Sequence, residues 1–248
     1  ISSVCRKVAR RVVVDGAEYH EDVTPERITQ HLGVPKYRAT MAEEVNEIGV
    51  ATGLAWTEVG GELLTIEAVT VPGKGLIKTT GKLGEVMQES VQAAFSFVKA
   101  RSPSYGVKPS LFGRKDIHVH LPEGAVPKDG PSAGVGMVTA MISTLTGIAV
   151  RRDVAMTGEV TFRGRVLPIG GLKEKLLAAL RAGLKTILLP KDNEKDLADI
   201  PKNVLDTLDI YLVSTMDEVL KTALAGPLTP ITPSADAVVG DAPDAVTH

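Results

Sequence analysis

The longest stretch without a charged residue, Gly130 to Val150, constrains the fold more than any other feature. Its length approaches that of a membrane-spanning helix. However, it contains Pro131, four glycines and several serines and threonines, which dilute its apolar content. We therefore predict a helix over residues 131–146 that is buried in the core of a soluble protein, and we expect no membrane partner.

Composition sets broad limits on the class of protein. The chain has 248 residues, of which 44% are hydrophobic, enough for one large domain and a small appendage. The formal net charge of −2 gives no electrostatic case for binding nucleic acid or a membrane surface. The single cysteine, Cys5, excludes an internal disulfide and fits a reducing compartment.

Residues 1–35 read as a small helical appendage. Val4, Val8 and Val12 recur at period four and predict a helix over residues 1–13, which Gly16 ends. A second helix is expected from Thr24-Pro25, a typical N-cap followed by proline at the first helical position, to about residue 32. A basic cluster on the first helix indicates a solvated helix face rather than a binding patch: Arg6, Lys7, Arg10 and Arg11.

The rest of the chain divides into a polar linker over residues 36–48, a main domain over 49–225 and a tail over 226–248. The tail has few large apolar residues, so we expect it to be disordered. In the main domain, strands and helices mix without regular βαβ alternation, which indicates the α+β class. Strands are expected at 51–59 and 62–71 around a Gly60-Gly61 turn, then at 116–121, 154–160, 165–169, 186–189 and 210–213. Helices are expected at 83–100, 131–146, 172–182, 194–198 and 216–224.

Ser132 is a candidate nucleophile. It lies among glycine and proline residues where a loop becomes a helix. Small neighbours let a substrate backbone approach, and N–H groups at a helix start can stabilise an oxyanion. The alternative is that Ser132 only caps the helix, and the local pattern leaves both interpretations open.

A serine hydroxyl needs a base before it attacks a carbonyl. Lysine can serve if removal from solvent lowers its pKa. Two lysines of one predicted helix qualify on a helical wheel. Lys175 is flanked by apolar residues at 172, 178, 179 and 182, and Lys173 by leucines at 176, 177 and 180. The wheel does not choose between them, and either could be a surface lysine with a snorkelling stem.

Asp116, His118 and His120 share one face of a predicted strand, because alternate residues align. They could bind a metal, or the histidines could supply a triad to Ser132. We favour the third interpretation, that the histidines brace the site or the fold, because so short a cluster is weak evidence for a metal site.

Three sequence blocks resemble the signatures of the Lon protease family, in that family's order and spacing. They are PKDGPSAG at 127–134, TGE at 157–159 and LPIGGLKEK at 167–175. The resemblance extends over about 51–224, including GLAWTEVGGELLTIE and GEVMQES, while residues 1–35 resemble the end of the small helical subdomain of the Lon ATPase. It implies an α+β domain of the ribosomal-protein-S5-domain-2-like type.

The resemblance also implies site roles. Ser132 would be the nucleophile of a serine endopeptidase, Lys175 its general base, and Thr157 a support for the lysine. No metal or organic cofactor would enter the reaction. Further residues would line or brace the site: Asp129, Glu159, His118 and His120.

Partners and context follow from the same resemblance. The substrates would be unfolded or damaged polypeptides, the assembly a ring of six, and the location a bacterial cytoplasm, or the mitochondrial matrix in a eukaryote. The chain contains no G-x-x-x-x-G-K-[ST] motif, with Thr80-Gly81-Lys82 coming nearest. ATP and Mg²⁺ would therefore serve only an ATPase part outside this chain.

Two rival interpretations remain. One is a non-catalytic Lon-like module that serves assembly or nucleic-acid binding. The other is a peptidase held inactive by the loop around Asp129. The presence of both Ser132 and Lys175 favours an active peptidase over the first of these.

Overall fold

The computed structural model describes residues 1–33, 45–57, 60–122 and 128–231. The chain divides into two compact units, Ile1–Ala39 and Thr40–His248. The division falls within the predicted linker, of which residues 36–44 lie outside the described residues.

The first unit contains the two predicted helices, α1 (Ser2–Asp15) and α2 (Pro25–Leu32). Val4 is buried and Val8 and Val12 are half-buried, which confirms the period-four pattern. Thr24 Oγ1 accepts a hydrogen bond from the backbone N–H of Arg27 at 3.4 Å, so the predicted N-cap is also confirmed.

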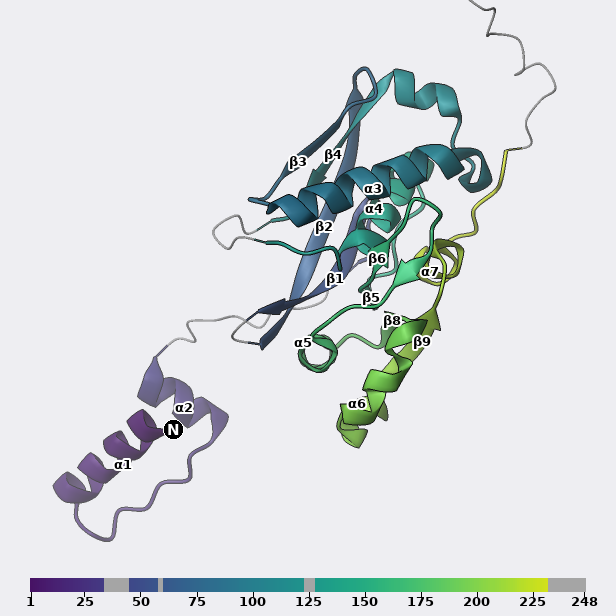
Figure 1. The fold of residues 1–248 in the computed structure, drawn as a ribbon. Coiled ribbons are helices and arrows are strands. Elements are labelled where there is room, and N and C mark those ends of the chain that lie inside the picture. The colour runs from purple at the N-terminus through teal and green to yellow at the C-terminus, as the bar shows by residue number, and fades with distance from the viewer. Residues whose placement is uncertain (34–44, 58–59, 123–127, 232–248) are drawn as a thin grey trace, which may run out of the picture. The chain divides into compact units, whose positions relative to one another are not determined.

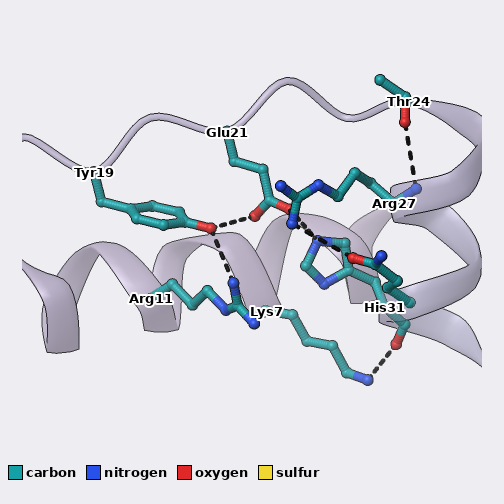
Figure 2. Close-up of polar contacts among 8 residues, drawn as sticks. Lys7, Arg11, Tyr19, Glu21, Thr24, Arg27 and His31 are labelled. Carbon is teal, nitrogen blue, oxygen red and sulfur yellow. Dashed lines mark hydrogen bonds and ion pairs between the residues drawn. The ribbon is translucent and has the colours of Figure 1, made fainter.

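A buried carboxylate organises the loop between these helices, as Figure 2 shows. The Glu21 side chain is only 3% exposed. Tyr19 donates its hydroxyl proton to Glu21 Oε2 at 2.6 Å, and His31 Nε2 lies 3.0 Å from Glu21 Oε1. Arg11 donates to the Tyr19 hydroxyl at 3.2 Å and Lys7 to the carbonyl of His31, so two residues of the basic cluster tie α1 to the loop and to α2.

The second unit is built on a seven-stranded mixed sheet in the order β3-β4-β2-β1-β5-β8-β9. β2 pairs antiparallel with β1 and β4, and the other neighbouring strands pair in parallel. The strands are β1 (Val50–Thr57), β2 (Gly60–Pro72), β3 (Ile77–Thr80), β4 (Lys115–His120), β5 (Val154–Met156), β8 (Thr186–Pro190) and β9 (Asp209–Val213). This mixed arrangement confirms the α+β class.

Helices cover both faces of the sheet. Along β5, Val154 and Met156 join one hydrophobic cluster and Ala155 joins the other, as expected when successive side chains point to opposite faces. Helices α3 (Glu85–Arg101), α4 (Gly134–Thr146) and α7 (Met216–Ala223) contribute to the first cluster, and Figure 1 shows α3 and α4 on one side of the sheet. Helices α5 (Leu172–Arg181) and α6 (Lys202–Leu205) contribute to the second cluster.

The uncharged segment forms α4, whose residues 134–143 are all buried. The predicted core helix is therefore confirmed, although it begins three residues later than expected. Within the described parts of the chain, no helix is both long and apolar enough to cross a membrane. The burial of α4 explains why this segment lacks charged residues, because a charged residue on any side of the helix would lose its hydration.

Three predictions of local structure need correction. Gly60 and Gly61 are not turn residues but the first residues of β2, paired with Thr57 and Trp56. The strand predicted over 154–160 is interrupted at residues 157 and 158, after which the chain forms a separate small sheet of β6 (Glu159–Val160) and β7 (Val166–Leu167). The helix predicted over 194–198 is a 3-10 helix over Lys191–Asp199. Helix α6 was not predicted.

Residues 226–231 of the predicted tail also belong to the second unit. Leu228 packs against the main hydrophobic cluster, and the Ile231 N–H donates to the carbonyl of Pro103 at 2.8 Å. The remaining tail residues, 232–248, lie outside the described residues. Composition did not predict that residues 226–231 pack on the domain, because this packing depends on one leucine side chain and one backbone hydrogen bond.

Candidate active site

Ser132 and Lys175 line the same cavity, with a volume of about 540 Å³. The walls come from β1, the start of β2, the start of α3, and segments 128–132 and 168–171. The apolar lining includes Leu54, Trp56, Leu63, Leu64, Met87, Pro168 and Ile169. Two candidates far apart in sequence therefore share one largely apolar recess.

Ser132 lies in the turn that precedes α4. The N-cap residue of α4 is Ala133, and no side-chain cap bond is made there, so the capping interpretation of Ser132 is wrong. The carbonyl of Ser132 accepts hydrogen bonds from the Gly158 N–H at 2.8 Å and from Thr157 Oγ1 at 3.3 Å. Its backbone is thus fixed by the segment that interrupts the predicted strand 154–160.

The first amides of α4 are already used inside the protein. Gly134 N–H donates to the Pro131 carbonyl and Val135 N–H to the Gly158 carbonyl, each at 3.1 Å. These two amides are therefore not free to bind an oxyanion, although the sequence pattern suggested the helix start for that task.

The structure separates the two lysines of α5. Lys173 is exposed, whereas Lys175 is only 2% exposed. Burial lowers the pKa of Lys175 from 10.5 to about 8, because the ammonium form loses its hydration. Three of the four residues that flank Lys175 on the helical wheel, Leu172, Ala179 and Ala182, are buried in the second hydrophobic cluster.

Thr157 connects the lysine to the serine backbone. It is 1% exposed, accepts a hydrogen bond from Lys175 Nζ at 3.0 Å, and donates one to the Ser132 carbonyl at 3.3 Å. Among the hydrogen bonds of the described residues, none joins Lys175 Nζ to Ser132 Oγ. The threonine therefore holds both partners in place while leaving the serine hydroxyl unbonded to the lysine.

Asp129 lines the same cavity, but its carboxylate is engaged elsewhere. Asp129 Oδ1 accepts hydrogen bonds from the N–H groups of Met87 at 2.9 Å and Gly130 at 2.8 Å. It thereby satisfies an amide in the first turn of α3 and ties the loop before Ser132 to that helix. No ion pair between Asp129 and Lys175 occurs within the described ranges.

Glu159 does not line the cavity that contains Ser132. It faces a neighbouring recess between α3 and β6, together with Glu89, Phe162 and Pro131. Pro131 lines both recesses, so Glu159 lies on the far side of the residue that precedes the serine.

The two histidines are also outside the Ser132 cavity. His120 Nδ1 lies 2.7 Å from Thr80 Oγ1, and His118 Nε2 is buried without a hydrogen-bond partner among the described residues. Asp116 Oδ1 accepts from the N–H groups of Lys74 and Leu76 and so holds the β2–β3 connection. Neither a triad with Ser132 nor a three-residue metal site is formed by the described residues.

Reasoning from the sequence missed the cavity walls. Leu54, Leu63 and Met87 line the cavity, and nothing local in the sequence marked them as a wall beside the serine. Trp56 also lines the cavity and is 56% exposed, but its exposure is a property of the tertiary structure that the sequence does not show.

The sequence profile described as the Lon protease (S16) C-terminal proteolytic domain matches residues 22–226. Lon protease of Azospirillum brasilense is 62% identical over 93% of this chain, and Lon protease of Escherichia coli (strain K12) is 55% identical over 90%. The chain spans 29% of the length of each of these two relatives.

The match covers α2 and the second unit as far as residue 226, including Ser132, Thr157 and Lys175. The extent of the match and the level of identity leave one conclusion. The chain belongs to the Lon protease family, and residues 22–226 correspond to its C-terminal proteolytic domain.

Proposed function

We propose that this chain is a serine endopeptidase in which Ser132 is the nucleophile and Lys175 the general base. The observation that carries the proposal is the burial of Lys175 in a cavity that it shares with Ser132. This burial lowers the pKa of Lys175 to about 8. A base is most effective when its pKa lies near the working pH. Lys173, by contrast, is exposed and does not line this cavity.

The contacts of Lys175 suggest how the reaction proceeds. One N–H of Lys175 is held by Thr157, so in the neutral amine the lone pair remains for the Ser132 hydroxyl. The amine takes the serine proton as the oxygen attacks the peptide carbonyl, then passes a proton to the leaving amine. Water attacks the acyl-enzyme with the same lysine as base and releases the second product.

The remaining site residues take supporting roles in this proposal. Thr157 orients the lysine, and Asp129 fixes the loop before the nucleophile through its bond to Met87 N–H. Glu159, His118 and His120 lie outside the cavity and act on the fold or the neighbouring recess. Hydrolysis by these groups calls for no metal or organic cofactor.

The wider context belongs to the same proposal. The substrates are unfolded or damaged polypeptides, because an extended chain can place an apolar side chain in the recess lined by Leu54, Leu63 and Met87. Within a Lon protease, ATP and Mg²⁺ act at an ATPase part, the assembly is a hexameric ring, and the role is protein quality control. The similarity to Lon proteases of Azospirillum brasilense and Escherichia coli favours a bacterial cytoplasm.

The test is cleavage of unfolded casein by the purified chain and by Ser132→Ala, each with and without ATP-Mg²⁺. The native chain is expected to cut casein slowly and equally in both conditions. Ser132→Ala is expected to lose cleavage while keeping its melting temperature, because the serine caps no helix. Near-native cleavage by Ser132→Ala would overturn the assignment of the nucleophile.

A non-catalytic module for assembly or nucleic-acid binding is the rival function. The net charge of −2 gives it no support. A chain that binds DNA in a salt-dependent manner and never cuts casein would establish it instead.

A further inference from the structure

The two glycines at the start of β2 are not explained by a turn, because both pair with residues of β1. Gly61 is buried and paired with Trp56 inside the β1–β2 ladder, where glycine weakens a strand. A Cβ built on Gly61 would lie 1.9 Å from the carbonyl oxygen of Glu174 and 3.0 Å from the backbone nitrogen of Lys175. Glycine is therefore required here by close approach of α5, not by a turn.

The closest approach falls on the first turn of α5, the turn that carries Lys175. The Lys175 N–H donates to the Gly171 carbonyl at 3.1 Å, so this backbone moves with the helix start. At the same end, Gly171 adopts φ 66°, and a Cβ on it would lie 2.8 Å from the Trp56 side chain. Two glycines on facing segments thus let the helix start rest directly on the hairpin.

Arg181 fixes the other end of this contact. It is the last residue of α5, and its guanidinium Nη2 donates to the Gly61 carbonyl at 2.7 Å. Gly61 of β2 therefore contacts the first turn of α5 at its α-carbon, and its carbonyl accepts a hydrogen bond from Arg181 in the last turn. Together these contacts set the height of the helix above the sheet.

That height decides how far Lys175 is removed from water. A Cβ on Gly61 would lie 1.9 Å from the carbonyl oxygen of Glu174. To restore an ordinary van der Waals distance, α5 would have to move by more than about 1 Å. Lys175 lines the cavity together with Trp56 and Glu62 of the hairpin, so lifting the helix start away from the hairpin would open a path for solvent to its amine.

We infer that Gly61 and Arg181 are positioning residues for Lys175: they seat α5 on the β1–β2 hairpin closely enough to exclude water from the lysine amine. The inference rests on the proposed function for its importance to catalysis. The seating itself is a property of the fold and can be measured without turnover.

The experiment follows the side-chain amine of Lys175 by NMR in selectively ¹³C,¹⁵N-lysine-labelled full chain carrying Ser132→Ala, which prevents self-cleavage. Comparison with Lys175→Met assigns its signal. Gly61→Ala is expected to raise the pKa of Lys175 towards its ordinary value, and Arg181→Met to raise it less. Arg181→Lys, which keeps a cationic donor, is expected to restore part of the effect. Gly113→Ala is the matched control, because a Cβ there meets no atom of the described residues within 4 Å.

The same substitutions in the active chain give a second readout. A rise of one pKa unit lowers the neutral fraction of a pKa 8 amine at pH 8 by about fivefold, so kcat at pH 8 is expected to fall about fivefold and to recover at higher pH. A structural defect alone would lower kcat at every pH.

A folded Gly61→Ala chain whose Lys175 titrates as in the parent would overturn the inference. If Gly61→Ala does not fold, Arg181→Met decides, and an unchanged lysine titration there overturns it equally. Failure of the proposed function looks different: the native chain would not cut casein, while the lysine titration would still respond to both substitutions.

Discussion

Each unit of this protein contains a buried charged side chain, Glu21 in the first unit and Lys175 in the second, and the surroundings of the two differ. Glu21 in the first unit is 3% exposed and is met by Tyr19, His31 and Arg27. Lys175 in the second unit is 2% exposed, and its one hydrogen bond among the described residues is to the neutral Thr157. Both side chains are therefore removed from water, but among the described residues only the Glu21 carboxylate has an oppositely charged side chain, Arg27, beside it.

The pKa values reflect this difference. The hydrogen bond from Tyr19, followed by contacts to His31 and Arg27, lowers the pKa of Glu21 and keeps it ionised. Burial lowers the pKa of Lys175 to about 8 and favours its neutral form. Partners offset the desolvation cost of a buried charge, whereas a buried amine without a counter-charge is costly to the fold and available for chemistry.

The largest expected effect tests which buried group is reactive. Lys175→Ala is expected to lower casein cleavage by about 10³-fold or more, as far as Ser132→Ala does, because a nucleophile and its base act as one unit. Glu21→Ala is expected to leave cleavage of casein nearly unchanged. The measurement is initial rate at pH 8 with the variants at equal concentration.

Lys173→Ala is the matched control, since it lies two residues away on the exposed side of α5 and should retain most activity. His118→Ala and His120→Ala should weaken cleavage without eliminating it. An active Lys175→Ala beside an inactive histidine variant would restore the triad hypothesis.

The next effect concerns the stability cost of the unpaired amine. Lowering a pKa from 10.5 to about 8 corresponds to about 3 kcal/mol between the protonation states. Because the folded-state pKa lies below the unfolded one, this penalty is present in full below pH 8 and disappears above pH 10.5. Lys175→Met is therefore expected to raise the free energy of unfolding by up to about 3 kcal/mol at pH 7.

Urea denaturation at pH 7 and pH 10.5 measures it, with Lys173→Met as the exposed control. The gain from Lys175→Met should shrink at the higher pH. Equal stability of Lys175→Met and the native chain at pH 7 would mean that water reaches the amine in the folded state.

The smallest effect is confined to the first unit. Glu21→Gln keeps the shape of the side chain but removes the charge that Arg27 and His31 face, so α1 and α2 should exchange amide hydrogens faster at pH 7. In the native chain this protection should persist above pH 4.5 and decline as pH falls through the lowered pKa of Glu21. Hydrogen-exchange mass spectrometry of residues 2–32 measures both.

Glu18→Gln is the control, because Glu18 is an exposed carboxylate in the same loop. Exchange that responds equally to both substitutions would show that net charge, rather than the contacts of Glu21, holds the loop.

The sequence by itself determined most of the secondary structure and the identity of the candidate nucleophile. Valine spacing gave α1, the Thr24-Pro25 pair gave the start of α2, and an uncharged run gave the buried α4, because each signal is local and follows helical periodicity or capping chemistry. The family resemblance named Ser132 and Lys175 from three short blocks.

Only the tertiary structure decided what surrounds those residues. The helical wheel left Lys173 and Lys175 equal, and the contacts of α5 with the sheet buried one and exposed the other. Gly61 looked like a turn residue until α5 was seen to approach its α-carbon, and Asp129, Glu159 and the two histidines proved to face different partners. Burial and close approach depend on segments distant in sequence, so they alone set the pKa of the lysine and no local pattern contains them.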